Sequence, residues 1–174
     1  MAIKWTDTTR PEPLPQRPLA ANGPTVWIAP AVERAVRAHL AGGLVERGGL
    51  LIGIAFADPA SGAVSEVGVL DSVAAGDADG TPVSLRMAPA VWSAAQARIA
   101  AAAPASGDHP RRIVGWYHSH PGLTAFFSDT DRQTQRAFFA HDYSIGWVID
   151  PINDLEALFV GADCAPIPRG PAPT

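Results

Sequence analysis

The sequence predicts a single α/β domain with a mixed, mostly antiparallel sheet flanked by helices. Strand-like and helix-like hydrophobic patterns alternate along the body of the chain, which is typical of this class. Hydrophobic residues make up 47% of the 174 residues, enough to build a buried core. We expect a Pro-rich N-terminal arm at residues 1–24, the domain at 25–163 and a C-terminal tail at 164–174.

The first half of the body contains a predicted strand, a helix and a hairpin. A short apolar run predicts a strand at 25–29. The helix expected at 30–43 has a proline at its start, apolar residues at helical spacing and two glycines at its end. The run GGLLIGIAF at 48–56 is typical of a buried strand, and the turn DPASGA leads to a second strand at 64–73.

The second half continues the alternation of strands and helices. The expected elements are a strand at 83–87, an alanine-rich helix at 87–104, a strand at 111–120, a helix at 129–139, and strands at 144–150 and 155–160. Both ends of the chain are rich in proline, and we expect them to lack regular structure. A solvated segment is the simpler interpretation of the N-terminal arm, and docking on the domain or on a partner is the alternative.

Charge and composition argue against several classes of partner. The net charge of −4 gives no basic surface for nucleic acid, and no cluster of Lys and Arg marks a membrane-binding segment. The single Cys164 excludes an internal disulfide and a multi-cysteine zinc site, so we expect it to be inert. The sequence has neither a signal-peptide pattern nor an apolar run long enough to cross a bilayer, so we expect a cytoplasmic protein.

The stretch WYHSHPGLTAFFSDTD at 116–131 gathers residues that bind metals. His118 and His120 are two residues apart on a predicted strand, so their imidazoles point to the same face. Asp131 falls in the first turn of the following helix, where its carboxylate can complete a set of two histidines and one aspartate. Such a set leaves a fourth tetrahedral position for water, as catalytic zinc requires.

Structural roles compete with this interpretation. Single histidines are usually solvated or packed, and we assign such roles to His39, His109 and His141. Ser128 and Asp131 also fit an N-terminal capping box of the helix, so a structural and a catalytic role for Ser128 both stay open. We expect Ser119 to point to the opposite face of the strand and to stabilise the loop, and Trp116 to pack.

The spacing H-S-H-P-x6-S-x-x-D resembles the signature of the JAMM metalloproteases, also called the JAB or MPN-plus family. That family also has an upstream glutamate followed by glycines, and ERGGLLIG supplies Glu46 with Gly49 and Gly53. The strand WVIDP after the motif is similar too, so the resemblance covers roughly residues 25–160. It implies a single JAMM/MPN domain with a cytidine deaminase-like fold.

The resemblance also implies roles for the motif residues. One zinc ion would be held by His118, His120 and Asp131. Glu46 would take the proton of the attacking water and pass it to the departing amine, and Ser128 would donate a hydrogen bond to the oxygen of the tetrahedral intermediate. Glu33 and Glu66 are the competing glutamates, but Glu33 lies in a helix rich in exposed charge and Glu66 lacks the following glycines.

Members of this family hydrolyse peptide or isopeptide bonds after the C-terminal glycine of ubiquitin-like proteins. The resemblance therefore implies a ubiquitin-like protein or its conjugates as the substrate, with proteins of a conjugation system as possible partners. One alternative is a peptidase that acts on a sulfur-carrier protein in cysteine or cofactor biosynthesis. Another is a non-catalytic scaffold that contains zinc. Intact Glu46 and Ser128 argue against a scaffold, because a structural zinc site requires neither.

Overall fold

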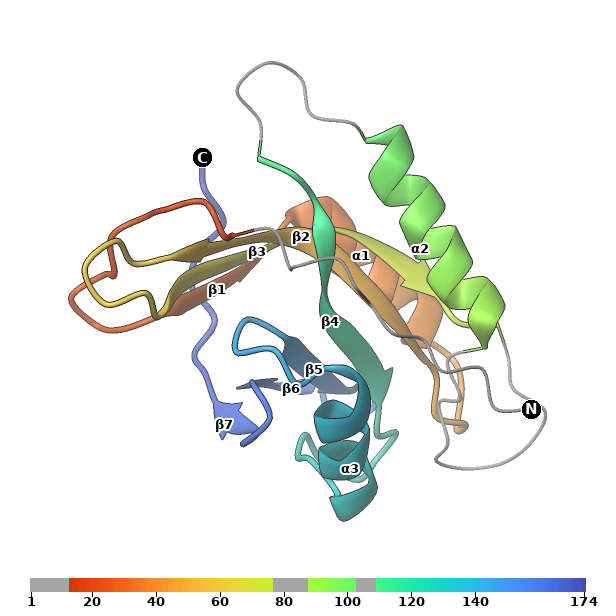
Figure 1. Cartoon of the computed structure of the whole chain (residues 1–174). Helices are drawn as coiled ribbons and strands as arrows, with labels where there is room; N and C mark the ends of the chain where they lie inside the picture. Colours follow the sequence, from red (N-terminus) through yellow and green to blue (C-terminus); the bar gives the residue numbers. More distant parts are fainter. Residues whose placement is uncertain (1–12, 77–87, 103–108) are drawn as a thin grey trace.

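A strongly curved sheet is the centre of the fold, as the computed structural model shows for residues 13–76, 88–102 and 109–174 (Figure 1). Seven strands of this described part follow the order β1-β3-β2-β4-β5-β6-β7. The strands are β1 Thr25–Ile28, β2 Gly48–Ala57, β3 Val64–Ala74, β4 Arg112–Ser119, β5 Ile145–Asp150, β6 Leu155–Val160 and β7 Ala165–Pro166. The helices are α1 Pro30–Leu40, α2 Pro89–Ala101 and α3 Asp129–Phe138.

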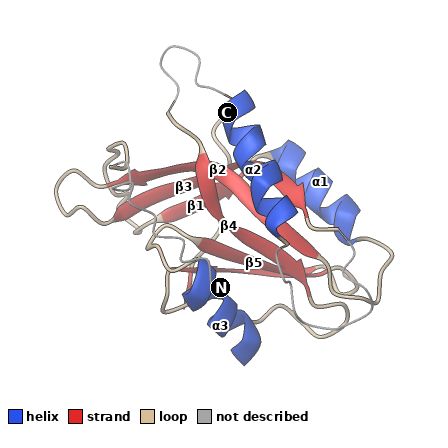
Figure 2. Cartoon of the chain, turned by 45° about the vertical axis from the view of Figure 1, so that its right-hand side comes forward, coloured by secondary structure: helices blue, strands red, loops and turns tan. Residues whose placement is uncertain are grey.

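The pairing of the strands confirms the predicted mixed, mostly antiparallel sheet. Only β1 with β3 and β4 with β5 are parallel among the described pairs. β2 and β3 form the predicted hairpin, and β2 pairs with β4 on its other side (Figure 2).

The helix predicted at 30–43 ends earlier, at Leu40, because Ala41 already has extended backbone angles. The strand predicted at 83–87 lies outside the described residues.

Two apolar clusters fill the two faces of the sheet. Val32, Val36 and Leu40 of α1 pack in one cluster with β1, β3 and the β5 residue Trp147. The second cluster joins α2 to Trp116 and to residues on either side of α3. Because Trp116 and Tyr117 are consecutive on β4, they belong to different clusters, as the alternation of side chains along a strand requires.

Residues 15–19 of the N-terminal arm dock on the domain, so the interpretation of a solvated arm was wrong for this segment. The backbone N–H of Arg17 donates to the carbonyl of Ala57, whose own N–H donates to Pro15, both at 2.9 Å. The Arg17 guanidinium also lies 3.8 Å from the centre of the Phe56 ring. β4 pairs with β2 only as far as Gly53, so the arm supplies hydrogen bonds at the unpaired end of β2.

The C-terminal tail is irregular over most of 167–174, as expected, but it begins with a short strand and is bonded to the sheet. The short strand β7 pairs with β6, and the N–H of Ile167 donates to the Leu158 carbonyl at 2.9 Å. Three residues later the N–H of Gly170 donates to Val26 of β1 at 2.7 Å. The tail therefore connects β6 to β1, the strand at the opposite edge of the sheet.

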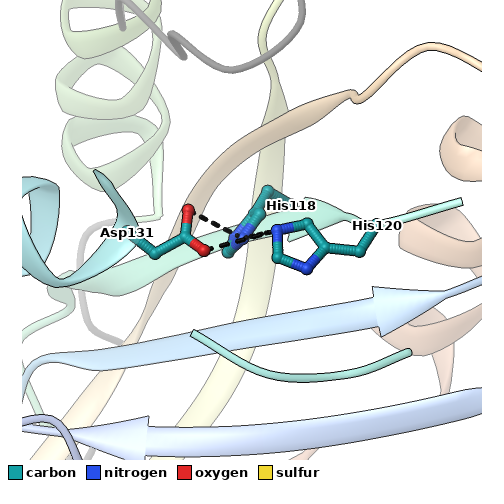
Figure 3. A group of neighbouring side chains, drawn as sticks. All are labelled: His118, His120 and Asp131. Atoms are coloured by element: carbon teal, nitrogen blue, oxygen red, sulfur yellow. Dashed lines mark hydrogen bonds and ion pairs between the residues drawn. The ribbon is translucent and has the colours of Figure 1, made fainter. Parts of the chain in front are cut away.

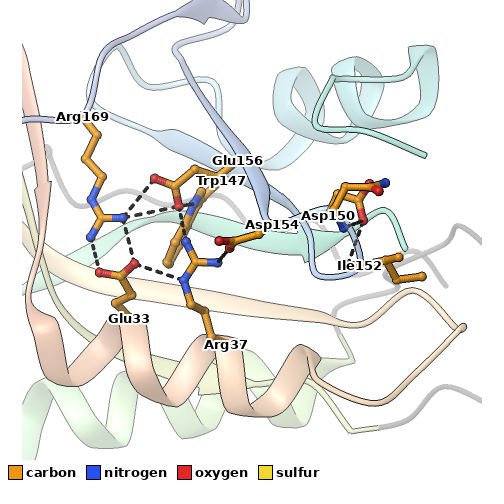
Figure 4. A network of polar contacts seen from close by, with 9 residues as sticks. Glu33, Arg37, Trp147, Asp150, Ile152, Asp154, Glu156 and Arg169 are labelled. Carbon is orange, nitrogen blue, oxygen red and sulfur yellow. Dashed lines mark hydrogen bonds and ion pairs between the residues drawn. The ribbon is translucent and has the colours of Figure 1, made fainter. Parts of the chain in front are cut away.

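An ion-pair network holds this tail against α1 (Figure 4). Arg169 of the tail bonds to Glu33 of α1 and to Glu156 of β6. Arg37 bonds to the same two carboxylates and to Asp154.

Of the helices in the described residues, none is both long and apolar enough to cross a membrane. The cytoplasmic location stays a prediction.

Candidate metal centre

The two histidines of the motif converge at the end of β4, as strand parity predicted. His118 lies within β4, and His120 follows its last residue with its N–H bonded to the carbonyl of Ile149 at 2.9 Å. This bond keeps His120 in line with the neighbouring strand β5. As a result, the Nε2 atoms of His118 and His120 are 3.2 Å apart.

Asp131 reaches the same point from the first turn of α3. Ser128 caps this helix: its Oγ accepts from the N–H of Asp131 at 3.2 Å, while its own N–H donates to Asp131 Oδ2 at 2.7 Å. The Ser128 hydroxyl also donates to Oδ2 at 2.7 Å. The predicted capping box is thus confirmed, and it orients the Asp131 carboxylate as well as starting the helix.

The two imidazoles and the carboxylate are positioned to bind a metal ion (Figure 3). Asp131 Oδ1 is 3.1 Å from Nε2 of His118, and Oδ2 is 3.3 Å from Nε2 of His120. Ligand atoms that each lie about 2.0–2.1 Å from a tetrahedral zinc ion are roughly 3.3 Å apart, so these spacings fit such an ion. All three side chains are at least nine-tenths buried, and their ligand atoms lie within 4.8 Å of one another.

The charges of Asp131 and His118 suit metal binding. Burial would raise the pKa of Asp131, but hydrogen bonds from His118 and His120 outweigh burial and hold that pKa well below its usual range. Burial lowers the pKa of His118, which favours the neutral imidazole that a metal requires. For His120 burial also acts downward, but hydrogen bonding and charge from Asp131 give a net increase of the pKa.

Glu46 lies beside this group without belonging to it. Its Oε1 is 3.9 Å from Nε2 of His120. Two contacts place the Glu46 segment: Gly48 is the pairing partner of His118, and the N–H of Arg47 donates to the Ser119 hydroxyl at 3.0 Å. The prediction that Ser119 stabilises the loop is therefore confirmed. Burial raises the pKa of Glu46 above its ordinary value, with a smaller opposing effect of His120.

The competing glutamates are engaged elsewhere. Glu33 belongs to the ion-pair network of the C-terminal tail. Glu66 accepts hydrogen bonds from Arg17 and from the Trp27 indole at the other end of β3. Neither carboxylate contacts the group formed by the two histidines and the aspartate, so Glu46 is the glutamate that the fold brings to this centre.

Sequence reasoning missed Gln135, which supports the centre through Trp116. Trp116 stacks on His118 with ring centres 4.4 Å apart, and its Nε1 donates to Gln135 Oε1 at 2.7 Å. The Gln135 amide donates in turn to the carbonyls of Phe139 and Ser144. Gln135 follows Asp131 by four residues, so its place on the same helix face was the available signal. Trp116 packs as predicted.

Other histidines have the structural roles assigned to them. His39 Nδ1 is 2.9 Å from the Tyr117 hydroxyl, His109 contacts the Phe56 ring edge-on, and His141 stacks on Tyr143. Cys164 is buried. The ligand-type residues brought together in the described part of the chain are therefore the predicted ones.

The fold and this buried group define a JAB-type (MPN) domain. The chain belongs to the family of prokaryotic homologs of the JAB domain, and the match covers residues 29–157. The resemblance to the JAMM family noted from the motif is thereby confirmed.

Two curated relatives and one solved structure extend this comparison. A 26S proteasome non-ATPase regulatory subunit 14 from Caenorhabditis elegans is 42% identical over 52 residues, 29% of this chain and 17% of that protein. Ubiquitin carboxyl-terminal hydrolase RPN11 from Saccharomyces cerevisiae is 39% identical over 49 residues, 28% of this chain and 16% of that protein. The chain therefore matches less than a fifth of either relative. Protein DSY2949 from Desulfitobacterium hafniense shares the fold, with a TM-score of 0.63 and 19% identity over 86% of this chain and 94% of that one.

Proposed function

We propose that this chain is a zinc-dependent peptidase or isopeptidase that hydrolyses the bond after the C-terminal glycine of a ubiquitin-like protein. Membership of the JAB family supports the class of reaction. The name of one matching relative, ubiquitin carboxyl-terminal hydrolase, supports the class of substrate. The observation that carries the proposal is the position of Glu46, next to the metal-binding group but outside it.

Zinc is the metal that the donor set favours. Two imidazoles and one carboxylate match the three protein ligands of catalytic zinc sites. A zinc ion held by His118, His120 and Asp131 would bring the pKa of water to ~7 and polarise the carbonyl of the scissile bond. The low pKa of Asp131 keeps the carboxylate charged for this purpose throughout the neutral range.

Glu46 would transfer the proton. A water molecule that attacks the carbonyl carbon must lose a proton, and the departing amine must gain one when the C–N bond breaks. The Glu46 carboxylate lies close enough to the ligand atoms to take the first proton and deliver it to the amine. Its raised pKa suits this task, because a carboxylate of very low pKa would hold the proton poorly.

Ser128 has a second role in this proposal, beyond its role as a helix cap. Its hydroxyl donates to Asp131 Oδ2, which already accepts the Ser128 N–H. The cap would therefore survive if the hydroxyl hydrogen turned to the substrate carbonyl oxygen. There it would stabilise the negative charge that develops on that oxygen.

A non-catalytic scaffold does not account for Glu46. A structural metal site uses four protein ligands and requires no additional buried carboxylate. The Glu46 side chain is only 13% exposed, and burying a carboxylate beside that of Asp131 is costly without a function. We therefore retain the hydrolase as the function that the geometry supports best.

The test uses Glu46→Gln, which keeps the shape of the side chain and removes its ability to accept a proton. The substrates are ubiquitin and a bacterial sulfur-carrier protein of ubiquitin fold, each extended beyond its C-terminal glycine by a fluorescent leaving group. We expect the zinc-loaded wild type to cleave at least one of them and Glu46→Gln to lose about 10²–10⁴-fold in kcat. Zinc content measured by elemental analysis should stay near one per chain in both proteins.

Two results would contradict the proposal. One is unchanged cleavage by Glu46→Gln, which would remove Glu46 from the reaction. The other is a wild type that binds zinc but cleaves neither protein nor the corresponding C-terminal peptides. The relative rates with ubiquitin and with the sulfur carrier decide which branch of the substrate class the chain prefers.

A further inference from the structure

Exposed apolar side chains gather around the metal centre. Among the described residues, eight large hydrophobic side chains are exposed, and five of them lie in three loops at this end of the sheet. These five are Leu44 (87% exposed), Leu123 (59%), Ile152 (57%), Val45 (51%) and Phe126 (45%). Large apolar side chains that gather on a surface mark a site of interaction.

The three loops emerge side by side because their strands are neighbours. Residues 41–45 precede β2, residues 121–126 follow β4 and residues 151–153 follow β5. At this end of the sheet Gly48 pairs with His118, and Ser119 pairs with Ile149. We call the exposed faces of these three loops the entrance rim, with Leu44, Val45, Leu123, Phe126 and Ile152 as its apolar members.

Two of the loops touch one another and the metal-binding group. A side chain placed on Gly122 would meet the Ile152 side chain at 3.6 Å, so the loops after β4 and β5 are in contact. The Phe126 ring lies 5.0 Å from the ring of His120. The loop before β2 ends at Glu46, whose carboxylate is 3.9 Å from His120. The rim therefore borders the metal centre from both sides.

The rim carries little charge. The rim stretches AGGLV, PGLTAF and PIN include neither Asp, Glu, Lys nor Arg. Asp154, which completes the turn after β5, is paired with Arg37 of α1. Charged residues make up 17% of the whole chain, so this part of the surface differs from the rest. Depletion of charge together with exposed apolar side chains is the composition of the centre of a protein interface.

Asp150 joins two of the loops through hydrogen bonds, and Figure 4 shows it beside Ile152. Its carboxylate is fully buried and accepts the backbone N–H groups of Gly122 at 2.9 Å and Thr124 at 3.0 Å. It also accepts the N–H groups of Ile152 and Asn153. Thr124 has a φ of 72°, a strained value for this residue type, which these bonds help to maintain. A preorganised surface loses little conformational freedom when a partner binds.

We propose that the entrance rim docks an apolar patch on the folded body of the substrate protein, outside the segment that is cut. This inference rests on the proposed function and adds a second, separate site of recognition. A substrate bond that reaches His120 and Glu46 must pass between the loops, so the body of that substrate is what covers them. An apolar rim of low charge, held by hydrogen bonds to Asp150, fits an uncharged apolar surface, and a flexible charged segment would gain little from it.

The experiment compares a folded substrate with its own C-terminal peptide. The variants are Leu44→Ser, Leu123→Ser and Ile152→Ser, none of which belongs to the metal-binding group. Phe138→Ser is the matched control, because Phe138 is 66% exposed on α3 and lies outside the rim. The substrates are the faster-cleaved of the two ubiquitin-fold reporters and the peptide of its last four residues with the same leaving group. The readout is kcat/KM for each substrate, together with the zinc content and the molecular mass of each variant in solution.

We expect each rim variant to lose roughly tenfold or more in kcat/KM for the folded substrate, through KM. Cleavage of the peptide, the zinc content and the Phe138→Ser variant should stay at the wild-type level. If the rim variants keep the wild-type kcat/KM for the folded substrate, or lose as much on the peptide as on the folded substrate, the inference is overturned and the proposed function stays intact. A wild-type dimer that the rim variants convert to a monomer would also overturn the inference, since a second copy would then cover the rim. Failure of the wild type to cleave either substrate would instead count against the proposed function, and with it this inference.

Discussion

The carboxylate of Glu46 lies 3.9 Å from Nε2 of His120, although 74 positions separate the two residues in the sequence. Pairing of Gly48 with His118 sets the register that brings them together. The distance is too long for an ordinary hydrogen bond and leaves Glu46 outside the ligand group. Ligands and proton acceptor therefore come from different segments, and each can be changed without removing the other.

Substitution of Asp131 separates the metal ligand from the helix cap. Asn at this position keeps an oxygen that can accept the Ser128 N–H but lacks the negative charge that attracts the zinc ion. We expect Asp131→Asn to fold and to bind zinc at least about 100-fold more weakly than the wild type. Asp129→Asn, at an exposed position in the same helical turn, is the control and should bind zinc normally. Equal zinc affinities in titration calorimetry would show that Asp131 is not a ligand.

Gln135 connects the centre to the core, and its loss should affect stability. The change Gln135→Leu removes the buried partner of the Trp116 indole N–H and of the Phe139 carbonyl. The Ser144 carbonyl loses one bond and keeps that from the Gly161 N–H. We expect unfolding free energy to fall by about 2–3 kcal/mol in urea titrations. Gln133→Leu, on the exposed side of α3, should change it by less than about 0.5 kcal/mol. A stable Gln135→Leu variant would mean that α3 repacks without this hydrogen-bonded link.

Local patterns made much of this fold predictable. The hairpin of β2 and β3 follows from two apolar runs around a turn, and the convergence of His118 with His120 follows from strand parity. The place of Asp131 follows from the capping box, because serine and aspartate at that spacing mark the start of a helix. In each case the determining residues are neighbours in the sequence.

Features that depend on distant pairing were not predictable in the same way. The N-terminal arm docks because β4 leaves the end of β2 unpaired, which only the register of those strands reveals. The C-terminal tail is ordered because Arg169 meets Glu33, 136 positions away. Asp150 likewise gives no local sign that its carboxylate will hold the loop after His120. These residues became recognisable only when the sheet order was known.

Gly53 has a packing role that a substitution should expose. A methyl group at this position would overlap the carbonyl oxygen of Gly68 on the neighbouring strand β3. Because backbone atoms cannot move aside as a flexible side chain can, we expect Gly53→Ala to lower the unfolding free energy by about 3 kcal/mol. Gly76→Ala is the control, since nothing lies within 4 Å of the added methyl group. If thermal unfolding of the two variants coincides, the close approach of β2 and β3 at Gly53 is not required.

Acid should release the C-terminal tail through Glu33. Hydrogen bonds from Arg169, with Arg37 adding to them against the effect of burial, lower the pKa of Glu33 from 4.5 to about 2. A carboxylate with a lowered pKa binds fewer protons in the folded state than in the unfolded state, so its stabilising effect is complete above pH 4.5. The effect declines as the pH falls from about 4.5 towards 2. We therefore expect Glu33→Gln to be less stable than the wild type at pH 7, with a difference that narrows between pH 4.5 and pH 3. Urea titrations of both proteins at pH 7, 5, 4 and 3 measure this difference in unfolding free energy. A difference that does not change with pH would show that the charge of Glu33 does not hold the tail.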